Sequence, residues 1–368
     1  MGLYSSINRF HTEKVISKTK KYLLFLHQNR EARSEIETAN CQLPTEMETI
    51  IEPVDLKLLI EELNEHKFVR QTNNGRRQIY VFTAHDSPNL MQEVGRLREI
   101  TFRDAGGGTG KAVDIDELDI DEIPFQQLIV WDPADKIIVG GYRFIHGKEI
   151  PCNDKGCINS ATGELFAFTA RFIRDYLPES IELGRSFVQP NYQPTFNLRK
   201  GMYALDNLWD GLGAMIIDNP DVKYFFGKMT MYPSYNRTAR DIILYFLNKF
   251  FPDNFHLMYP IIPVTLETPD DFLSQIFIAP TFEENYKILV QTIRKYHESV
   301  PPLVNAYMNL SPTMMTFGTA INHEFGEVEE TGILINIEDI YPRKKDRHLS
   351  SYMERLSKLR NWRWRRKK

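Results

Sequence analysis

Hydrophobic residues recur along this chain with two different spacings, which predict an alternation of helices and strands. Spacings of three and four residues predict helices over 55–66, 87–100, 163–175, 203–217 and 239–250. Short apolar or alternating runs predict strands at 78–84, 126–131, 136–144, 181–188, 223–229 and 332–337. The linker Asp132-Pro133-Ala134-Asp135 is expected to join the second and third of these strands as a hairpin. This order predicts an α/β protein with helices on both faces of its sheet.

The strand Glu182-Leu183-Gly184-Arg185-Ser186-Phe187-Val188 carries two charges in an otherwise buried pattern. Residues three apart on a strand point to opposite faces unless a bulge intervenes. Breaking a buried ion pair by removing one partner costs ~3–5 kcal/mol, so both charges need partners. The strand 136–144 holds Arg143, and upstream lie Asp116 and Asp119. We therefore expect an ion network inside the fold.

Composition changes this picture little. The chain has 368 residues, 42% of them hydrophobic, which is enough for a full core. Its three cysteines are too few for a disulfide framework, which favours a reducing cytoplasm. We see no apolar run near the ~18 residues of a membrane-spanning helix, and the short apolar run 22–26 lacks a signal-peptide cleavage site.

Charge and polarity divide the chain into three predicted parts. Residues 1–46 form a polar accessory segment, unless translation truly starts at Met47. Residues 47–342 form the main domain. Residues 343–368 form a basic tail that contains tryptophan and carries 12 Lys and Arg against two acidic residues. Tryptophan beside arginine on a helix suits a membrane interface or an acidic protein surface, and a disordered tail is the alternative.

The sequence does not support three familiar motifs: a phosphate-binding loop, a metal site and an O-acyltransferase signature. The glycine loop 105–112 has alanine where a phosphate-binding P-loop needs glycine and Ser or Thr, and it follows a helix, which favours a turn. Cys152, Cys157 and His146 have no fourth ligand at a matching spacing, so no metal is expected. None of the nine histidines is followed by aspartate five residues later, which excludes the His-x4-Asp signature of glycerolipid-type O-acyltransferases.

Two charged segments keep a functional interpretation. The acidic run 114–122 is typical of a solvated loop, but the apolar neighbours of Asp116 and Asp119 anchor these two to the core, where they can hold an arginine or an amine. Arg199, Lys200 and Gly201 precede a predicted helix. Backbone N–H groups beside two cations form either a phosphate site for a carrier-bound cofactor or a basic helix start without a ligand.

Four motifs in order carry a resemblance to a known family: residues 96–103, Asp116-x-x-Asp119, residues 141–144 and residues 182–188. Their combination resembles the GNAT-like N-acyltransferases of bacterial aminolipid synthesis, which make lyso-ornithine lipids or N-acylglycine and include members named hemolysin. Acyl-homoserine-lactone synthases are remote relatives with a similar skeleton. The resemblance covers roughly residues 50–340. It implies a GNAT-like acyl-CoA N-acyltransferase fold, with a central mixed twisted sheet, helices on both faces and a C-terminal helical extension.

The resemblance also implies roles for individual residues. Glu182 would be the general base or would organise a water molecule. Arg143 and Arg185 would hold the acidic cluster or bind the carboxylate of the amino acid, and Asp116 and Asp119 would be their partners. Candidate substrate-binding residues, which would line the path of the acyl or pantetheine group or receive its phosphate, are Arg98, Phe102, Arg103, Phe187, Arg199, Lys200 and Gly201.

The implied reaction is transfer of a long, 3-hydroxylated acyl chain from acyl carrier protein to the amino group of an amino acid. Glycine is the first choice of acceptor and ornithine the second. The chain would bind no permanent cofactor, no metal and no nucleic acid. It would reside in the cytoplasm, with peripheral contact to the inner face of the membrane. The rival interpretations are a signal synthase, a coenzyme-A-dependent acetyltransferase and a binding module without enzymatic activity.

Overall fold

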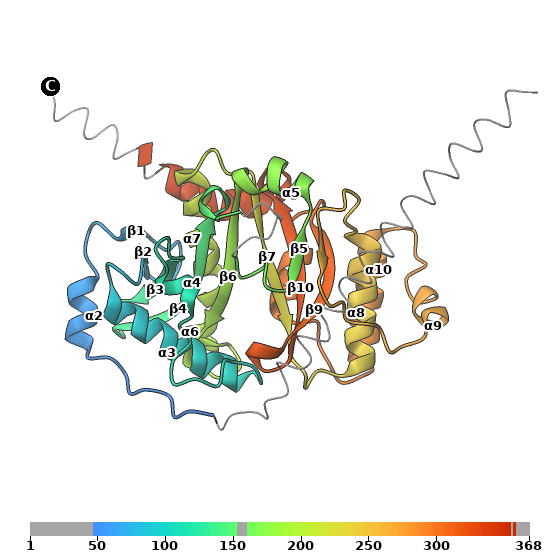
Figure 1. Ribbon diagram of the computed structural model, residues 1–368, viewed down its shortest axis with the longest axis horizontal. Helices are drawn as coiled ribbons and strands as arrows, with labels where there is room; N and C mark the ends of the chain where they lie inside the picture. Colours follow the sequence, from blue (N-terminus) through green and yellow to red (C-terminus); the bar gives the residue numbers. More distant parts are fainter. Residues whose placement is uncertain (1–46, 153–159, 355, 358–368) are drawn as a thin grey trace, which may run out of the picture. The chain divides into compact units, whose positions relative to one another are not determined.

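An eight-stranded twisted sheet forms the centre of the computed structural model, which describes residues 47–152, 160–354 and 356–357 (Figure 1). Its strands, in spatial order, are β1 (Phe68–Gln71), β2 (Gln78–Phe82), β3 (Gln126–Asp132), β4 (Ile137–His146), β6 (Ser180–Val188), β7 (Tyr224–Met231), β10 (Val328–Asn336) and β9 (Met315–Asn322). β6 and β7 pair in parallel, and the other neighbours pair antiparallel. The sheet is therefore mixed.

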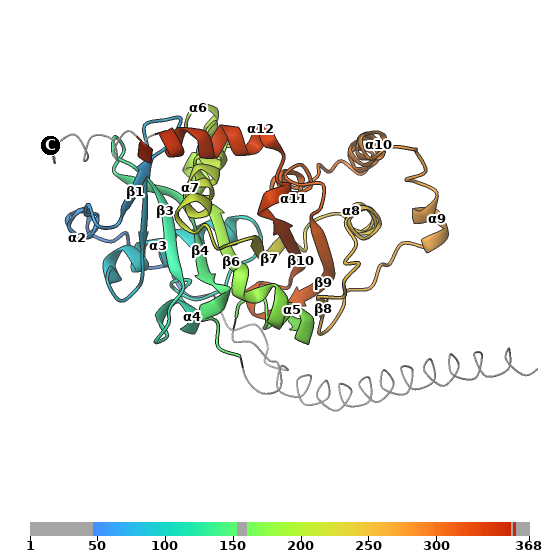
Figure 2. The same cartoon turned by 90° about the horizontal axis from the view of Figure 1, so that it is seen from above.

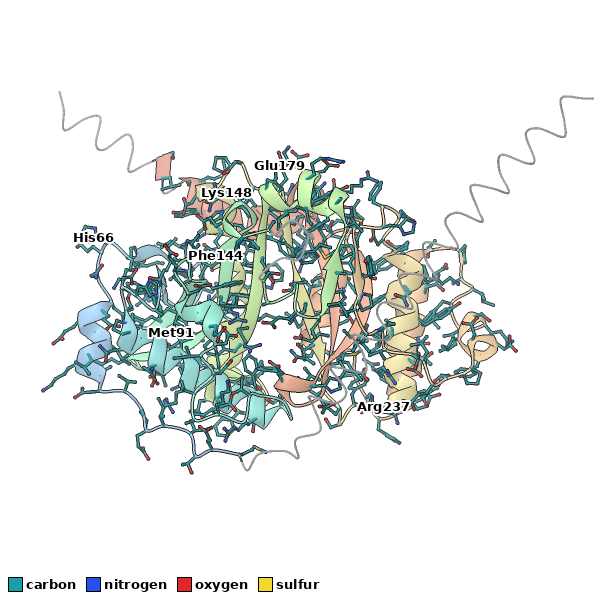
Figure 3. The ribbon with its side chains drawn as sticks, viewed as in Figure 1. His66, Met91, Phe144, Lys148, Glu179 and Arg237 are labelled. Atoms are coloured by element: carbon teal, nitrogen blue, oxygen red, sulfur yellow. The ribbon has the colours of Figure 1, made fainter. Side chains whose placement is uncertain are left out.

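Helices cover both faces of this sheet (Figure 2). One face carries α7 (Ala204–Asp218), α8 (Arg237–Phe250), α10 (Phe282–Arg294) and α11 (Pro302–Met308) over the largest apolar core. The other face carries α2 (Leu56–Glu62), α3 (Pro88–Asp104), α4 (Glu117–Ile120), α5 (Ala170–Asp175) and a small sheet of β5 (Phe166–Phe168) and β8 (Met258–Pro260). Met91 and Phe144, both labelled in Figure 3, belong to the cores of the two opposite faces.

The expected α/β architecture is confirmed, including the hairpin of β3 and β4 and the strands β2, β6, β7 and β10. One expected element is wrong, because 163–175 does not form one helix but contains β5 followed by α5. Thr169 separates the two by capping α5, its hydroxyl accepting from the N–H of Phe172. The pattern also failed to reveal β1, β9, α9 (Asp270–Ser274), α10 and α11.

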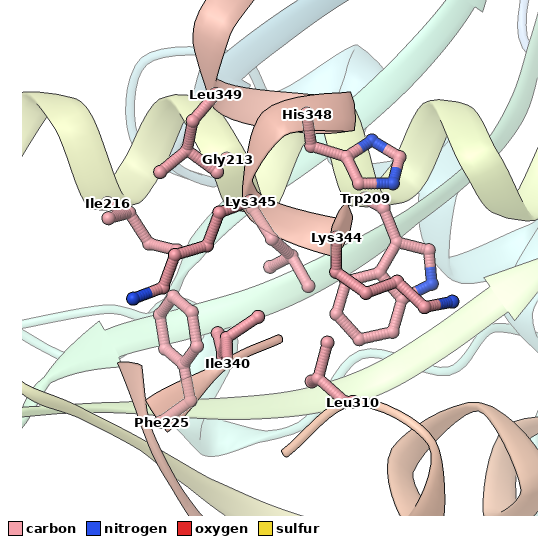
Figure 4. Close-up of a pocket in the computed structure, with 11 residues that line it drawn as sticks. Trp209, Gly213, Ile216, Phe225, Leu310, Ile340, Lys344, Lys345, His348 and Leu349 are labelled. Atoms are coloured by element: carbon pink, nitrogen blue, oxygen red, sulfur yellow. The ribbon is translucent and has the colours of Figure 1, made fainter. Parts of the chain in front are cut away.

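The C-terminal helical segment begins with α12 (Pro342–Lys345), continues to Glu354 and packs against α7. His348 Nδ1 lies 2.8 Å from Asp210 Oδ1, and the Tyr352 hydroxyl donates to Asp218 at 3.1 Å. A cavity of about 20 Å³ stays between the segment and α7, lined by residues that include Trp209 and Phe225 (Figure 4). It is large enough for about one water molecule and not for an acyl chain. It lies on the face opposite Glu182, because Phe225 is adjacent to Phe226, the partner of Glu182.

Residues from Glu48 onward form one compact unit, separate from residues 1–47. The expected accessory segment 1–46 and most of the basic tail, 358–368, lie outside the described residues.

Candidate active site

A row of polar residues crosses one face of the central sheet. Paired residues on neighbouring strands point to the same face. The pairs Gln127–Arg143, Arg143–Gly184, Ile145–Glu182, Glu182–Phe226 and Lys228–Gly332 therefore bring their members together. Gln127, Arg143, Glu182 and Lys228 consequently share the face that α3, α4 and the segment 160–165 cover.

A β-bulge brings Arg185 to this same face. Between the pairs Gly141–Phe187 and Arg143–Gly184, β6 has one residue more than β4, and Arg185 adopts φ +47°. A left-handed conformation is costly for a residue with a side chain and is typical of bulges at functional sites. The sequence predicted that Glu182 and Arg185 would point to opposite faces unless a bulge intervened. The bulge is present, and both side chains point to the same face.

The expected ion network is present and is built around α4. Asp116 caps this short helix, and Asp116 and Asp119 form a reciprocal capping box. Arg143 Nη1 donates to both Asp116 oxygens at 2.6 and 2.7 Å and to Asp119 Oδ2 at 3.2 Å. Arg98 Nη1 donates to the same Asp119 oxygen at 3.2 Å, and Gln127 bridges Arg98 and Asp119.

Arg185 connects to the network through a carboxylate that the sequence analysis did not select, Asp114. Its Nε lies 3.0 Å from Asp114 Oδ2, and its Nη2 lies 3.6 Å from Asp116 Oδ2. Its guanidinium also stacks on the Phe325 ring, with 4.1 Å between the guanidinium carbon and the ring centroid. Burial raises the pKa of Asp114, and Arg185 partly offsets this effect.

Burial divides the network into an inner and an outer part. Arg98, Asp119 and Arg143 are sealed in the interior, whereas the side chains of Asp116 and Arg185 are 30% and 15% exposed. Burial raises the pKa of Asp116, but Arg143 and Arg185 outweigh it and hold the pKa well below its usual range. Asp116 is therefore anionic near neutral pH. The inner residues position the outer two, which are accessible from solvent.

Glu182 lies beside this network with a partly used carboxylate. Its Oε1 accepts the backbone N–H of Thr162 at 2.6 Å, and its Oε2 has no hydrogen-bond partner among the described residues. Glu182 is fully buried, and burial raises its pKa. A carboxylate with a raised pKa is a better proton acceptor than an ordinary glutamate near neutral pH.

Lys228 is a site residue that the sequence analysis missed. Its ammonium donates to the Ala161 carbonyl at 2.5 Å and lies 2.8 Å from Glu330 Oε2. Burial raises the pKa of Glu330, but Lys228 outweighs it, so the net pKa is lowered. Together, Lys228 and Glu182 hold the segment around Ala161 and Thr162 against the sheet. Lys228 is a single charged residue in the apolar strand Tyr224–Met231, and the same pattern identified Arg143 in its strand.

The strands β6 and β7 separate next to Glu182. They pair from Ser180–Tyr224 to Leu183–Gly227 and, in the described part of the chain, no further. The close approach at the last pair requires glycine, because a Cβ on Gly227 would lie 2.3 Å from the Leu183 carbonyl oxygen. Beyond this point the facing N–H and C=O groups of β6 and β7 do not pair with each other.

Three of the predicted substrate-binding residues serve the packing around α3. Phe102 is buried and stacks edge-on against Phe325 at 5.0 Å between ring centroids, and Phe187 is buried in the same core. Arg103 donates to Glu99 and to the carbonyls of Glu48 and Lys111. The glycine loop closes around the same buried Glu99 carboxylate, which accepts from Thr109 and Gly110. The loop thus binds an internal carboxylate.

The predicted phosphate-binding residues lie at α6 (Leu198–Gly201), beyond the end of β6. The Lys200 ammonium is 2.5 Å from Asp135 Oδ2, and the Lys200 carbonyl accepts from Arg77. Gly201 packs against the chain, since a Cβ there would lie 2.4 Å from the Pro194 nitrogen. Arg199 is exposed. The structure therefore engages Lys200 and Gly201 in internal contacts and does not bring them to the ion network.

Within the ranges that the structure describes, no group of three or more His, Cys, Asp or Glu side chains could hold a metal ion. The same ranges contain no helix that is long and apolar enough to cross a membrane.

Comparison with known proteins gives three kinds of match. The acetyltransferase (GNAT) domain family matches residues 97–199. A glycine N(alpha)-acyltransferase of Bacteroides thetaiotaomicron is 54% identical over 308 residues, which are 84% of this chain and 91% of that protein. The glycine N(alpha)-acyltransferase of Phocaeicola vulgatus is also 54% identical over 308 residues, covering 84% of this chain and 94% of its own length.

Among solved structures, the CoA-dependent acyl-homoserine lactone synthase BjaI with SAM and isopentyl-CoA matches at a TM-score of 0.32 and 10% identity. The match covers 76% of this chain and 90% of BjaI. The same enzyme with MTA matches equally.

Proposed function

This chain belongs to the family of the glycine N(alpha)-acyltransferases, and from this premise we propose that it acylates glycine with a long 3-hydroxyacyl chain. The family and the GNAT domain make it an acyltransferase that acts on the amino group of an amino acid. The proposal adds the identity of the acceptor, an acyl carrier protein thioester as the donor, and a role in the synthesis of membrane lipids.

The observation that carries the proposal is the position of Glu182. It is a buried carboxylate with one unpartnered oxygen, one residue before the last pair that joins β6 to β7. A primary amine attacks a thioester only after losing its proton, and a positioned base contributes ~10²–10⁴-fold to the rate. Because Thr162 covers Glu182, we propose that the proton passes from the glycine ammonium through a water molecule to Glu182.

The amine nitrogen then bonds to the thioester carbonyl carbon, whose oxygen becomes an oxyanion. N–H groups of β6 beyond Leu183, where the strand no longer pairs with β7, suit this oxyanion, since they are fixed by the pairing of β6 with β4. When the intermediate collapses, the C–S bond breaks, the nitrogen loses its second proton, the thiolate of the donor takes up that proton, and the N-acyl amino acid is released.

Charge selects the acceptor in this proposal. The carboxylate of glycine pairs with the partly exposed Arg185, and Asp116 attracts the ammonium before it is deprotonated. Arg98, Asp119 and Arg143 act as positioning residues, because they are buried and touch Asp116 or its helix.

The donor and the location follow from the same proposal. An acyl carrier protein delivers the thioester on a flexible arm, and no tightly bound cofactor is needed. The product partitions into lipid, so we propose peripheral contact of residues 350–368 with the inner face of the cytoplasmic membrane.

The test is direct. Purified protein is incubated with 3-hydroxyacyl carrier protein and single amino acids, and thiol release and N-acyl product are measured. We expect product with glycine. If product forms with ornithine and not with glycine, ornithine is the acceptor. Turnover with acetyl-CoA as the only acyl donor would contradict the proposal that the donor is an acyl carrier protein thioester.

A further inference from the structure

Four large apolar side chains stand exposed within eight residues around α6. The exposed fractions are 74% for Phe196, 69% for Leu198, 57% for Met202 and 37% for Tyr203. Soluble proteins seldom expose apolar side chains in a cluster without a partner that covers them. We call these four residues the α6 knob.

The fold holds the α6 knob in place. The Asn197 side chain caps α6 by accepting the N–H of Lys200, and Gly201 packs against Pro194. The Gln193 side chain donates to the Val188 carbonyl at the end of β6. The exposed side chains therefore project from a backbone that is fixed to the sheet, as a preformed binding surface requires.

The charges around the α6 knob are mostly positive. Arg76, Lys136 and Arg199 are exposed and form no ion pair with any residue that the structure describes. Arg76 and Lys136 lie in the turns whose neighbours, Arg77 and Asp135, contact Lys200. An apolar centre with a cationic rim is complementary to a protein that presents an apolar residue among acidic ones.

The α6 knob lies at the open end of the separated strands. The parallel strands β6 and β7 both continue past their last pair in the same direction. α6 follows the end of β6 on this side (Figure 1). A hollow of about 460 Å³ beside Phe196 is lined by Ile137, Asn191, Tyr192 and other residues of this end. A donor that docks here can direct a prosthetic arm between the strands toward Glu182, which a lipid surface has no need to do.

We propose that the α6 knob is the docking site of the acyl carrier protein, with Phe196 and Leu198 as apolar anchors and Arg76, Lys136 and Arg199 as the cationic rim. This inference rests on the proposed function, because it concerns the donor of that reaction.

The test separates docking from chemistry. Binding of the host's 3-hydroxyacyl carrier protein is measured by fluorescence anisotropy, and turnover is measured with that donor and with the same acyl group on pantetheine. We expect Phe196→Asp and Leu198→Asp to raise the Kd for the carrier protein by ~10-fold or more, as for other interface anchors. The loss should be confined to the carrier-protein donor.

Matched controls are Phe272→Asp on α9, which is 46% exposed, and Lys287→Glu on α10, which is also exposed. Both should bind the carrier protein like the parent. Arg199→Glu should weaken binding most at low ionic strength, because exposed charges are screened by salt.

Each outcome decides the matter. Unchanged carrier-protein binding in both knob variants would overturn the inference, as would equal losses with the pantetheine donor. Loss of binding to anionic vesicles with carrier-protein binding intact would assign the α6 knob to the membrane instead. Failure of the proposed function is distinct, since the parent would then bind the carrier protein without acylating an amino acid.

Discussion

A carboxylate in the interior, as Glu182 is, loses the hydration that stabilises its charge. Burial raises the pKa of Glu182 above its unfolded value, so folding favours the protonated form. The contribution of Glu182 to stability is therefore fully present below the unfolded pKa and is lost as the pH rises through the folded pKa. The charged form that the proposed reaction needs is the form that the fold disfavours.

The substitution Glu182→Gln separates the effect of Glu182 on stability from its effect on the reaction. The amide oxygen can still accept from Thr162, and the cost of a buried charge disappears, so the midpoint of thermal unfolding at pH 8 should equal or exceed that of the parent. Acyl transfer should fall by ~10²–10⁴-fold. The parent should lose activity as the pH falls through the raised pKa of Glu182, above the range of an exposed glutamate, and the variant should lack this limb.

Glu283→Gln on α10, an exposed glutamate, is the matched control and should behave like the parent. An active Glu182→Gln protein with an unchanged pH profile would remove Glu182 from the mechanism.

The sequence identified much of the ion network because charges in apolar strands are unusual. Arg143, Asp116 and Asp119 do meet, as expected. Asp114 was passed over in favour of its neighbours, since a run of acidic residues does not reveal which carboxylate turns inward. Lys228 was missed although it carried the same signal as Arg143. The partner of Glu182, a backbone N–H, has no sequence signature at all.

At the scale of elements, the geometry of the site depends on where two parallel strands part. Gly227 permits the last close approach of β7 to β6, and Gly184 follows on β6 with more room. A Cβ on Gly184 would meet only the Arg143 side chain, at 3.5 Å or more, whereas one on Gly227 would strike the Leu183 backbone. The close approach of the two strands therefore requires glycine at position 227 but not at position 184.

Gly227→Ala should destabilise the protein by ~1–3 kcal/mol, the usual cost of inserting a methyl group where the structure has no space. Gly184→Ala is the control and should change the free energy of unfolding by less than ~1 kcal/mol, because its contacts are ordinary. Chemical denaturation of both variants gives the comparison. Equal stability of the two would mean that the strands separate for another reason.

Elements with regular, strongly patterned segments could be predicted, such as the β3–β4 hairpin and α7. Those that depend on distant partners could not. β5 is three residues long and exists because it pairs with β8, about ninety residues later, so a local pattern reads it as part of a helix. β9 mixes threonine, glycine and asparagine with apolar residues, and its pairing with β10 defines it as a strand.

At the scale of the whole molecule, the C-terminal region has two parts with different proposed roles, one in stability and one in membrane contact. Residues up to Ser357 are bound to the domain through His348, Tyr352 and Ser351, which accepts from Arg70. Residues 358–368 carry seven Arg and Lys.

Ending the chain after Ser357 should keep thermal stability and acyl transfer but weaken binding to anionic vesicles. Ending it after Tyr341 should also lower the midpoint of thermal unfolding by roughly 5 °C or more, because the buried Asp210 loses its histidine partner. Differential scanning calorimetry and vesicle sedimentation measure the two effects. Full vesicle binding by the shorter deletion would exclude the tail as a membrane contact.

The order of strands in the sheet also governs how the chain emerges from a ribosome. β7 pairs with β10, whose residues are made about a hundred positions later, and β9 is completed only just before it. At ~5–20 residues per second, the open edge of β7 waits roughly 5–20 s for its neighbour. An unpaired strand edge invites pairing with other chains, so a nascent chain that stalls before β10 is the aggregation-prone species of this protein.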